Sequence, residues 1–96
     1  MLIKNAIENG SWTNCGYQQI TSLSAATALT VPAGSKVAVV VAETQAVRWR
    51  DDGENPTATV GMPLATGTYL VLDGDLSAVK FIEQTASAKL NVSYYK

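Results

Sequence analysis

The sequence predicts an all-β fold: a single-domain antiparallel β-sandwich, jelly-roll-like, with about eight short strands behind an irregular N-terminal arm. Three observations predict this class. Val, Ile, Thr, Tyr and Leu recur in short runs, Gly, Pro, Asn or Asp separates the runs, and no window carries helical periodicity. The 96 residues are enough for one hydrophobic core.

The first sixteen residues are rich in Asn and Gly and have few β-branched positions. We therefore predict an arm over residues 1–16 and a sandwich domain over residues 17–96. The arm carries the apolar side chains of Leu2, Ile3, Ile7 and Trp12. These side chains need a surface, which is either a neighbouring subunit or the arm's own domain, and both interpretations stay open here.

The strands are expected where β-forming residues lie between turn residues. The expected ranges are 17–23, 28–31, 36–42, 46–50, 58–62, 68–72, 78–82 and 88–95. Their even spacing is typical of a sandwich or jelly roll.

Four segments predict how the chain turns between these strands. Pro32-Ala33-Gly34-Ser35 combines a fixed φ with a residue free to take positive φ, which predicts a turn. Asp52-Gly53 opens a longer loop that reaches Pro56, and Ala65-Thr66-Gly67 is a further turn. Asp73-Gly74 is the dipeptide favoured in tight hairpins, so we expect the strands on either side of it to pair.

Alternation along three strands predicts which side chains are buried. Val47 and Trp49 share the core face of one strand, and Arg48 and Arg50 share its polar face. The segment 36–42 is apolar on both sides, which predicts cover on both faces or a partner subunit; small Ala38 and Ala42 are expected to face outward. At the C-terminus Tyr94 and Tyr95 point to opposite faces, so one of them stays partly exposed.

The composition excludes several functional classes. Only 16% of residues are charged and the formal net charge is -1, so no positive field would attract a nucleic acid. No stretch resembles a signal peptide or reaches the length of a membrane span, which predicts a protein made and kept in a cytoplasm without a membrane partner. The one cysteine, Cys15, is expected to be a small buried or half-buried residue.

No motif predicts catalysis. The chain has no histidine and no nucleophile-elbow, phosphate-loop or dinucleotide signature. We therefore expect no enzyme activity, cofactor, metal or small-molecule substrate. The acidic clusters 51–54 and 73–75 could in principle bind calcium, but Asp in such short segments is more typical of turns.

Arg48 and Arg50 flank Trp49 and precede Asp51 and Asp52, which makes this the most distinctive local feature. Arginine is enriched at interface hot spots and binds carboxylates through two hydrogen bonds. The alternative is a solvated face whose arginines pair across the sheet or within the loop, which the sequence favours slightly.

Three blocks carry a resemblance to a known class: QAVRWRDDGENPTATVGMPL over residues 45–64, LSAVKFI over 76–82 and LNVSYY over 90–95. Together they cover about half of the chain. The chain resembles small virion-associated structural proteins of tailed bacteriophages. The resemblance implies a compact β-fold that belongs to the head or tail, and it carries over no catalytic residue.

The predicted function is a capsid decoration or cement subunit, made in the host cytoplasm and located on the capsid surface of the virion. Its expected partners are the major capsid protein and other copies of itself, as a homotrimer at a symmetry axis. The candidate partner-binding residues are Leu2, Ile3, Ile7, Trp12, Arg48, Arg50 and Tyr95.

Three alternatives remain at this point. The same fold could form a ring in the neck or tail of the particle. A carbohydrate-binding module would need Trp12, Tyr69 and Tyr95 exposed and coplanar as stacking platforms. An enzyme would need a deep pocket lined by acidic residues from the set Asp51, Asp52, Asp73 and Asp75.

Overall fold

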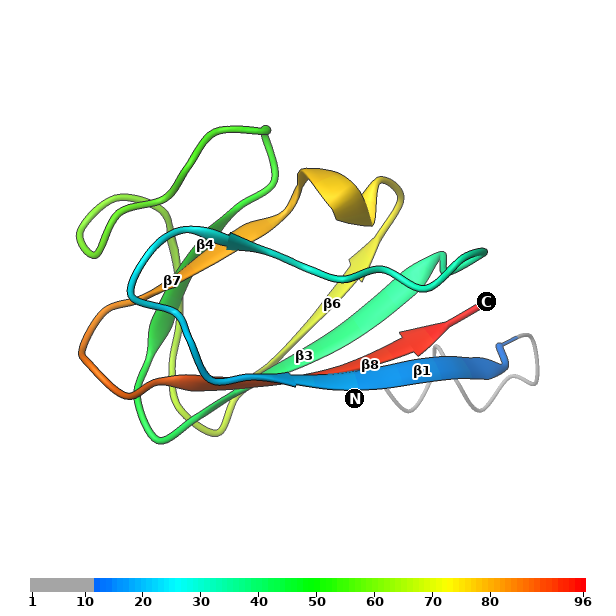
Figure 1. The fold of residues 1–96 in the computed structure, drawn as a ribbon, viewed down its shortest axis with the longest axis horizontal. Helices are drawn as coiled ribbons and strands as arrows, with labels where there is room; N and C mark the ends of the chain where they lie inside the picture. The colour runs from blue at the N-terminus through cyan, green and yellow to red at the C-terminus, as the bar shows by residue number, and fades with distance from the viewer. Residues whose placement is uncertain (1–11) are drawn as a thin grey trace.

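The computed structural model describes residues 12–96, and Figure 1 shows an all-β molecule built from two sheets. A short 3₁₀ turn, η1 (Leu76–Ala78), precedes the seventh strand. The strands are β1 (Asn14–Ile20), β2 (Thr27–Ala28), β3 (Val37–Glu43), β4 (Val47–Arg50), β5 (Met62–Leu64), β6 (Tyr69–Asp73), β7 (Lys80–Glu83) and β8 (Lys89–Tyr95).

The two sheets have the strand orders β1-β8-β3-β6 and β2-β7-β4-β5, and every pair of neighbours is antiparallel. The chain thus pairs its first strand with its last, its second with its seventh, its third with its sixth and its fourth with its fifth. This rolled-up pairing is the order of a jelly roll, which confirms the predicted fold class. No helix in residues 12–96 is long and apolar enough to cross a membrane.

The core lies between the two sheets and follows the alternation of the strands. Leu90, Val92 and Tyr94 of β8 are fully buried, while Tyr95 on the other face is half-buried, which confirms that one of the two tyrosines stays partly exposed. From the second sheet Val47 and Phe81 are fully buried. Trp49 packs against this core but keeps part of its surface exposed. One hydrophobic cluster therefore joins both sheets.

The start of β1 shows how local chemistry fixes an element. The strand begins at Asn14, three residues before its predicted start, and a bulge at Cys15 lets Gly16 pair with Tyr94. A Cβ on Gly16 would lie 2.9 Å from Cγ of Pro32, so only glycine fits here. Half-buried Cys15 packs against the core and lies 3.2 Å from the Ser35 hydroxyl, which agrees with its predicted burial.

Three of the four predicted turns are confirmed. Gly34, Gly53 and Gly67 all have positive φ of about 80°. The amide of Ser35 donates to Pro32 at 3.1 Å, and the amide of Thr68 donates to Ala65 at 3.1 Å.

The fourth prediction, a hairpin at Asp73-Gly74, is wrong. Strand β6 pairs with β3 in the first sheet, whereas β7 pairs with β2 and β4 in the second. Gly74 has the positive φ expected of a turn, but the chain then enters η1 and crosses between the sheets. The same turn delays the seventh strand, which starts at Lys80 and not at Ala78.

Two further predictions from alternation and propensity are also wrong. Residues 58–61 form a loop, because the Thr57 hydroxyl accepts the amides of Thr59 and Val60 and the chain turns there before β5. In β3, Ala38 and Ala42 face the core together with Val40, and the larger Val37, Val39 and Val41 occupy the outer side. The predicted strand at 28–31 shortens to β2, which has two residues.

Candidate functional site

Arg48 fastens the loop of residues 51–61 to the outer side of the second sheet. Its Nε donates to the Ala58 carbonyl at 3.2 Å and its Nη1 to the Gly61 carbonyl at 2.8 Å. When the Gln84 amide is oriented with its oxygen toward the guanidinium, it accepts from Nε at 2.9 Å and from Nη2 at 3.1 Å. The guanidinium donors of Arg48 that face the loop are thus all bonded within the chain. Arg48 therefore has a structural role.

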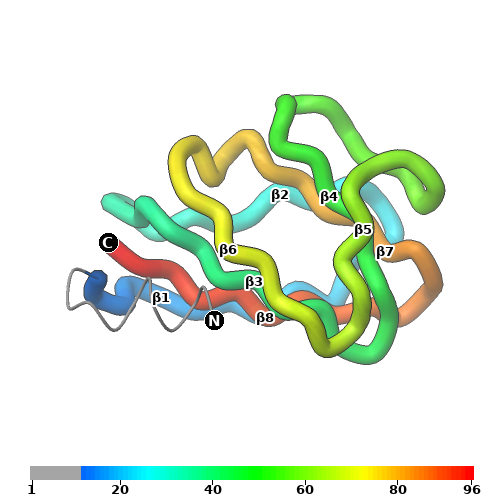
Figure 2. Tube along the Cα trace, turned by 180° about the vertical axis from the view of Figure 1, so that it is seen from behind, coloured from blue at the N-terminus to red at the C-terminus, as the bar shows by residue number. Residues whose placement is uncertain are grey.

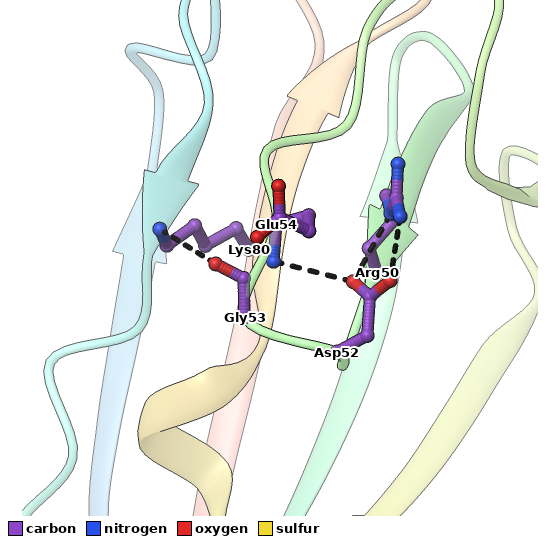
Figure 3. Close-up of polar contacts among 5 residues, drawn as sticks. All are labelled: Arg50, Asp52, Gly53, Glu54 and Lys80. Atoms are coloured by element: carbon purple, nitrogen blue, oxygen red, sulfur yellow. Dashed lines mark hydrogen bonds and ion pairs between the residues drawn. The ribbon is translucent and has the colours of Figure 1, made fainter.

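Arg50 pairs with Asp52 within the same loop (Figure 3). Its Nε donates to Oδ1 at 3.1 Å and its Nη2 to Oδ2 at 2.5 Å, a two-point contact. The hydrogen bond from Arg50 lowers the pKa of Asp52, and Asp52 in turn raises the pKa of Arg50. Both groups are solvated, so this pair orients the loop and contributes little stability.

The far side of the loop is held by Lys80 of β7, next to β4 (Figure 3). Its Nζ donates to the Asn55 side-chain oxygen at 3.1 Å and lies 3.4 Å from the Gly53 carbonyl. Gly61 ends the loop with φ +142, and a Cβ there would lie 3.2 Å from three atoms of Arg48, Pro56 and Trp49. The alternative interpretation of the arginines, pairing within the loop, is therefore the one that the structure supports.

A shallow hollow of about 340 Å³ lies beside this loop, lined by Arg50, Asp51, Asp52, Val60, Gly61 and Met62. Val60 and Met62 are exposed by 54% and 57%. Of the carboxylates that a catalytic pocket would need, only Asp51 and Asp52 line the hollow. Asp52 is already engaged by Arg50, and Asp75 accepts the amide and hydroxyl of Ser77 at 3.1 and 2.5 Å. Asp52 and Asp75 therefore make the local hydrogen bonds that are typical of turns, as the sequence favoured.

The outer face of the first sheet is a second surface, and it is uncharged across its centre. Directly opposed residues of antiparallel strands share a face, so the register places side chains from all four strands in rows. One row contains Tyr17, Ser93, Val39 and Val71, and the next contains Gln19, Asn91, Val41 and Tyr69. Among residues 12–96, charges lie only at the ends of the face, with Asp73 at one end and Glu43 and Lys89 at the other.

Polar groups on this face are joined to one another. The Tyr17 hydroxyl donates to Oδ1 of Asn91 at 2.5 Å, and Nε2 of Gln19 donates to the same oxygen at 3.1 Å. Nδ2 of Asn91 donates to Glu43 at 2.8 Å. These bonds hold Tyr17, which is 63% exposed, in a fixed position at the border of the sheet.

The predicted partner-binding residues do not form one site. Leu2, Ile3 and Ile7 lie outside the described residues. Trp12 is half-buried just before β1, and Tyr95 is half-buried at the end of β8, where the Ser93 hydroxyl donates to its oxygen at 3.3 Å. Figure 1 shows the end of β8 and strand β4, which carries Arg48 and Arg50, at opposite ends of the long axis.

Sequence reasoning missed the large apolar side chains that are most exposed among the described residues: Tyr17, Val60 and Met62. For the second face of β3 the sequence predicted cover or a partner, because the segment 36–42 is apolar on both sides, and Val37 and Val39 on that face are buried. For Val60 and Met62 no signal existed, since the sequence around them predicts a strand with one buried face.

Comparisons with protein-family models, with curated proteins and with solved structures found no match to this chain.

Proposed function

We propose that this chain is a structural subunit of a tailed-phage virion, a capsid decoration or cement protein that binds the major capsid protein and other copies of itself. The observation that carries the proposal is the uncharged outer face of the sheet β1-β8-β3-β6. Such a face needs few charges desolvated when a protein partner covers it, and half-buried Val41 and Val71 add apolar surface to it.

Two further observations agree with this role. The jelly roll is a fold used by viral capsid domains, although a fold by itself does not define a function. The blocks at 45–64, 76–82 and 90–95 resemble virion-associated proteins, and the first of them forms the β4 strand and the pinned loop 51–61. A rigid loop at one end and an apolar face along one side are suited to binding two different neighbours.

The geometry favours a protein partner over a carbohydrate. Stacking on a sugar requires exposed aromatic rings, whereas Trp12, Tyr69 and Tyr95 are all half-buried. Tyr17 is the aromatic side chain exposed on the outer face among the described residues, and its hydroxyl is already bonded to Asn91.

The experiment is to mix the purified chain with phage heads that lack it and to image the particles at subnanometre resolution. We expect density at the local threefold axes of the capsid, with the outer face of the first sheet against the capsid protein. Density at the neck or tail alone would instead support the ring-protein alternative. Heads that gain no density at any concentration would contradict a virion role.

A matched pair of variants tests the face itself. Val71→Lys adds a charge at a half-buried, apolar position of the outer face and is expected to weaken head binding by about tenfold or more. Thr66→Lys adds the same charge in an exposed turn away from the face and is expected to bind normally. Circular dichroism of both variants verifies that they are folded, and equal binding by both would exclude this face.

A further inference from the structure

Strand β1 forms one border of the first sheet and bonds to β8 on one side only. The Lys36 amide donates to the Tyr95 carbonyl at 2.8 Å, so the backbone of Tyr95 faces β3. Backbone groups alternate in direction along a strand, so the N–H and C=O groups of Tyr94, Val92 and Leu90 face β1. They lie opposite Gly16, Gln18 and Ile20. The backbone N–H and C=O groups of Tyr17 and Gln19 consequently point away from the sheet.

Nothing in residues 12–96 bonds to these four backbone groups. Neither Tyr17 nor Gln19 donates or accepts through its backbone on the open side, and Figures 1 and 2 show no described strand beyond β1 at this border. An open row of this kind is a template for another strand.

The other three border strands are protected in ways that proteins commonly use. Strand β2 has only two residues, β5 has three and contains Pro63, and β6 ends in Asp73. Strand β1 has seven residues, no proline and no charge. No charged residue occurs at any position from 9 to 35, so two such borders can approach without repulsion between like charges.

We propose that β1 pairs antiparallel with β1 of a second copy, across a twofold axis close to Gln18. In this arrangement the open backbone groups of Tyr17 meet those of Gln19 of the partner subunit, and the two first sheets become one continuous sheet. The exposed ring of Tyr17 then packs beside the partner's strand. The pairing depends on the border geometry alone and holds whether or not the chain belongs to a virion.

The first test is the mass of the full chain in solution, measured by sedimentation over a range of concentrations. We expect a dimer, whereas the sequence interpretation expected a trimer. Gln19→Pro removes the open N–H while leaving the backbone bonds between β1 and β8 intact, so the dissociation constant should rise by about tenfold or more, because each dimer loses two hydrogen bonds. Thr66→Pro is the control, since it places proline in a turn position that favours it.

A charge pair gives a second test that does not require proline in a strand. Gln19→Lys and Gln19→Glu should each be monomeric, and an equimolar mixture should recover the dimer, because opposite charges then face each other across the axis. Amide hydrogen exchange of Tyr17 and Gln19 should slow as the wild-type chain is concentrated. A wild-type monomer at every concentration, a trimer, or a dimer unchanged by all three substitutions would overturn the proposal.

Discussion

Tyr94 is the residue in which burial and hydrogen bonding combine most closely. Its side chain is fully buried near the end of β8, and its hydroxyl donates to the side-chain oxygen of Gln18. The same oxygen accepts the Thr30 amide at 3.0 Å, so Gln18 joins β1, β8 and the segment before β3. Burial raises the pKa of the Tyr94 phenol from 10.0 to about 12.

This shift predicts a specific loss of stability at high pH. Because the folded pKa lies above the unfolded value of 10.0, the contribution of neutral Tyr94 is complete below pH 10 and is lost as the pH rises through about 12. In Tyr94→Phe this part of the pH dependence should disappear, at a cost of about 1 kcal/mol at neutral pH for the lost hydrogen bond. Denaturant unfolding of both proteins at neutral pH and at about pH 11 provides the measurement. Parallel losses in the two proteins would show that another group is responsible.

At the scale of elements, the 51–61 loop is attached to the second sheet by side chains that reach it from two strands. Arg48 reaches it from β4, and Lys80 reaches it from β7. A guanidinium supplies several donors in one plane, and an ammonium cannot reproduce two bonds to separate carbonyls at these positions.

Arg48→Lys should therefore release the loop, with a loss of about 1–2 kcal/mol of unfolding free energy. Cleavage by an added protease at residues 57–61 should also become faster. Arg50→Lys is the control: it weakens only a solvated pair with Asp52 and should cost less than about 1 kcal/mol. Equal losses for the two substitutions, or an unchanged cleavage rate, would mean that Arg48 does not hold the loop.

The sequence predicted elements well where local chemistry decides them. Strand β8 alternates cleanly through Leu90, Val92 and Tyr94, and the Pro32–Ser35 turn contains its own proline and glycine. The sequence predicted poorly those connections that depend on pairing between distant parts of the chain. Asp73-Gly74 is a dipeptide typical of hairpins, yet β6 pairs with β3 and β7 pairs with β4. The packing of the two sheets determines this pairing.

The candidate surfaces were likewise predictable only as far as local sequence determines them. Arg48 and Arg50 were identified from their type and spacing, but only the fold shows that both are used within the chain. The outer face of the first sheet joins side chains from β1, β3, β6 and β8, which are far apart in sequence, so no local pattern could reveal it.

At the scale of the whole molecule, one core is shared by both sheets, which predicts a single cooperative unfolding transition. The two tryptophans allow a test, because Trp12 precedes β1 in the first sheet and Trp49 lies on β4 in the second. Trp49→Phe leaves a reporter on the first sheet, and Trp12→Phe leaves one on the second. In each variant, tryptophan fluorescence and circular dichroism should give the same denaturation midpoint. Midpoints that differ between the two probes would indicate that the sheets unfold separately.

The position of β8 between β1 and β3 has a consequence for how the protein is made. A ribosome synthesises β1 before β8, so until residue 95 has been added β1 has no partner within the first sheet. Strands β3 and β6 can already pair during that time, whereas the uncharged β1 stays available for unwanted pairing until β8 arrives. The first sheet is therefore completed only when β8 joins β1 to β3.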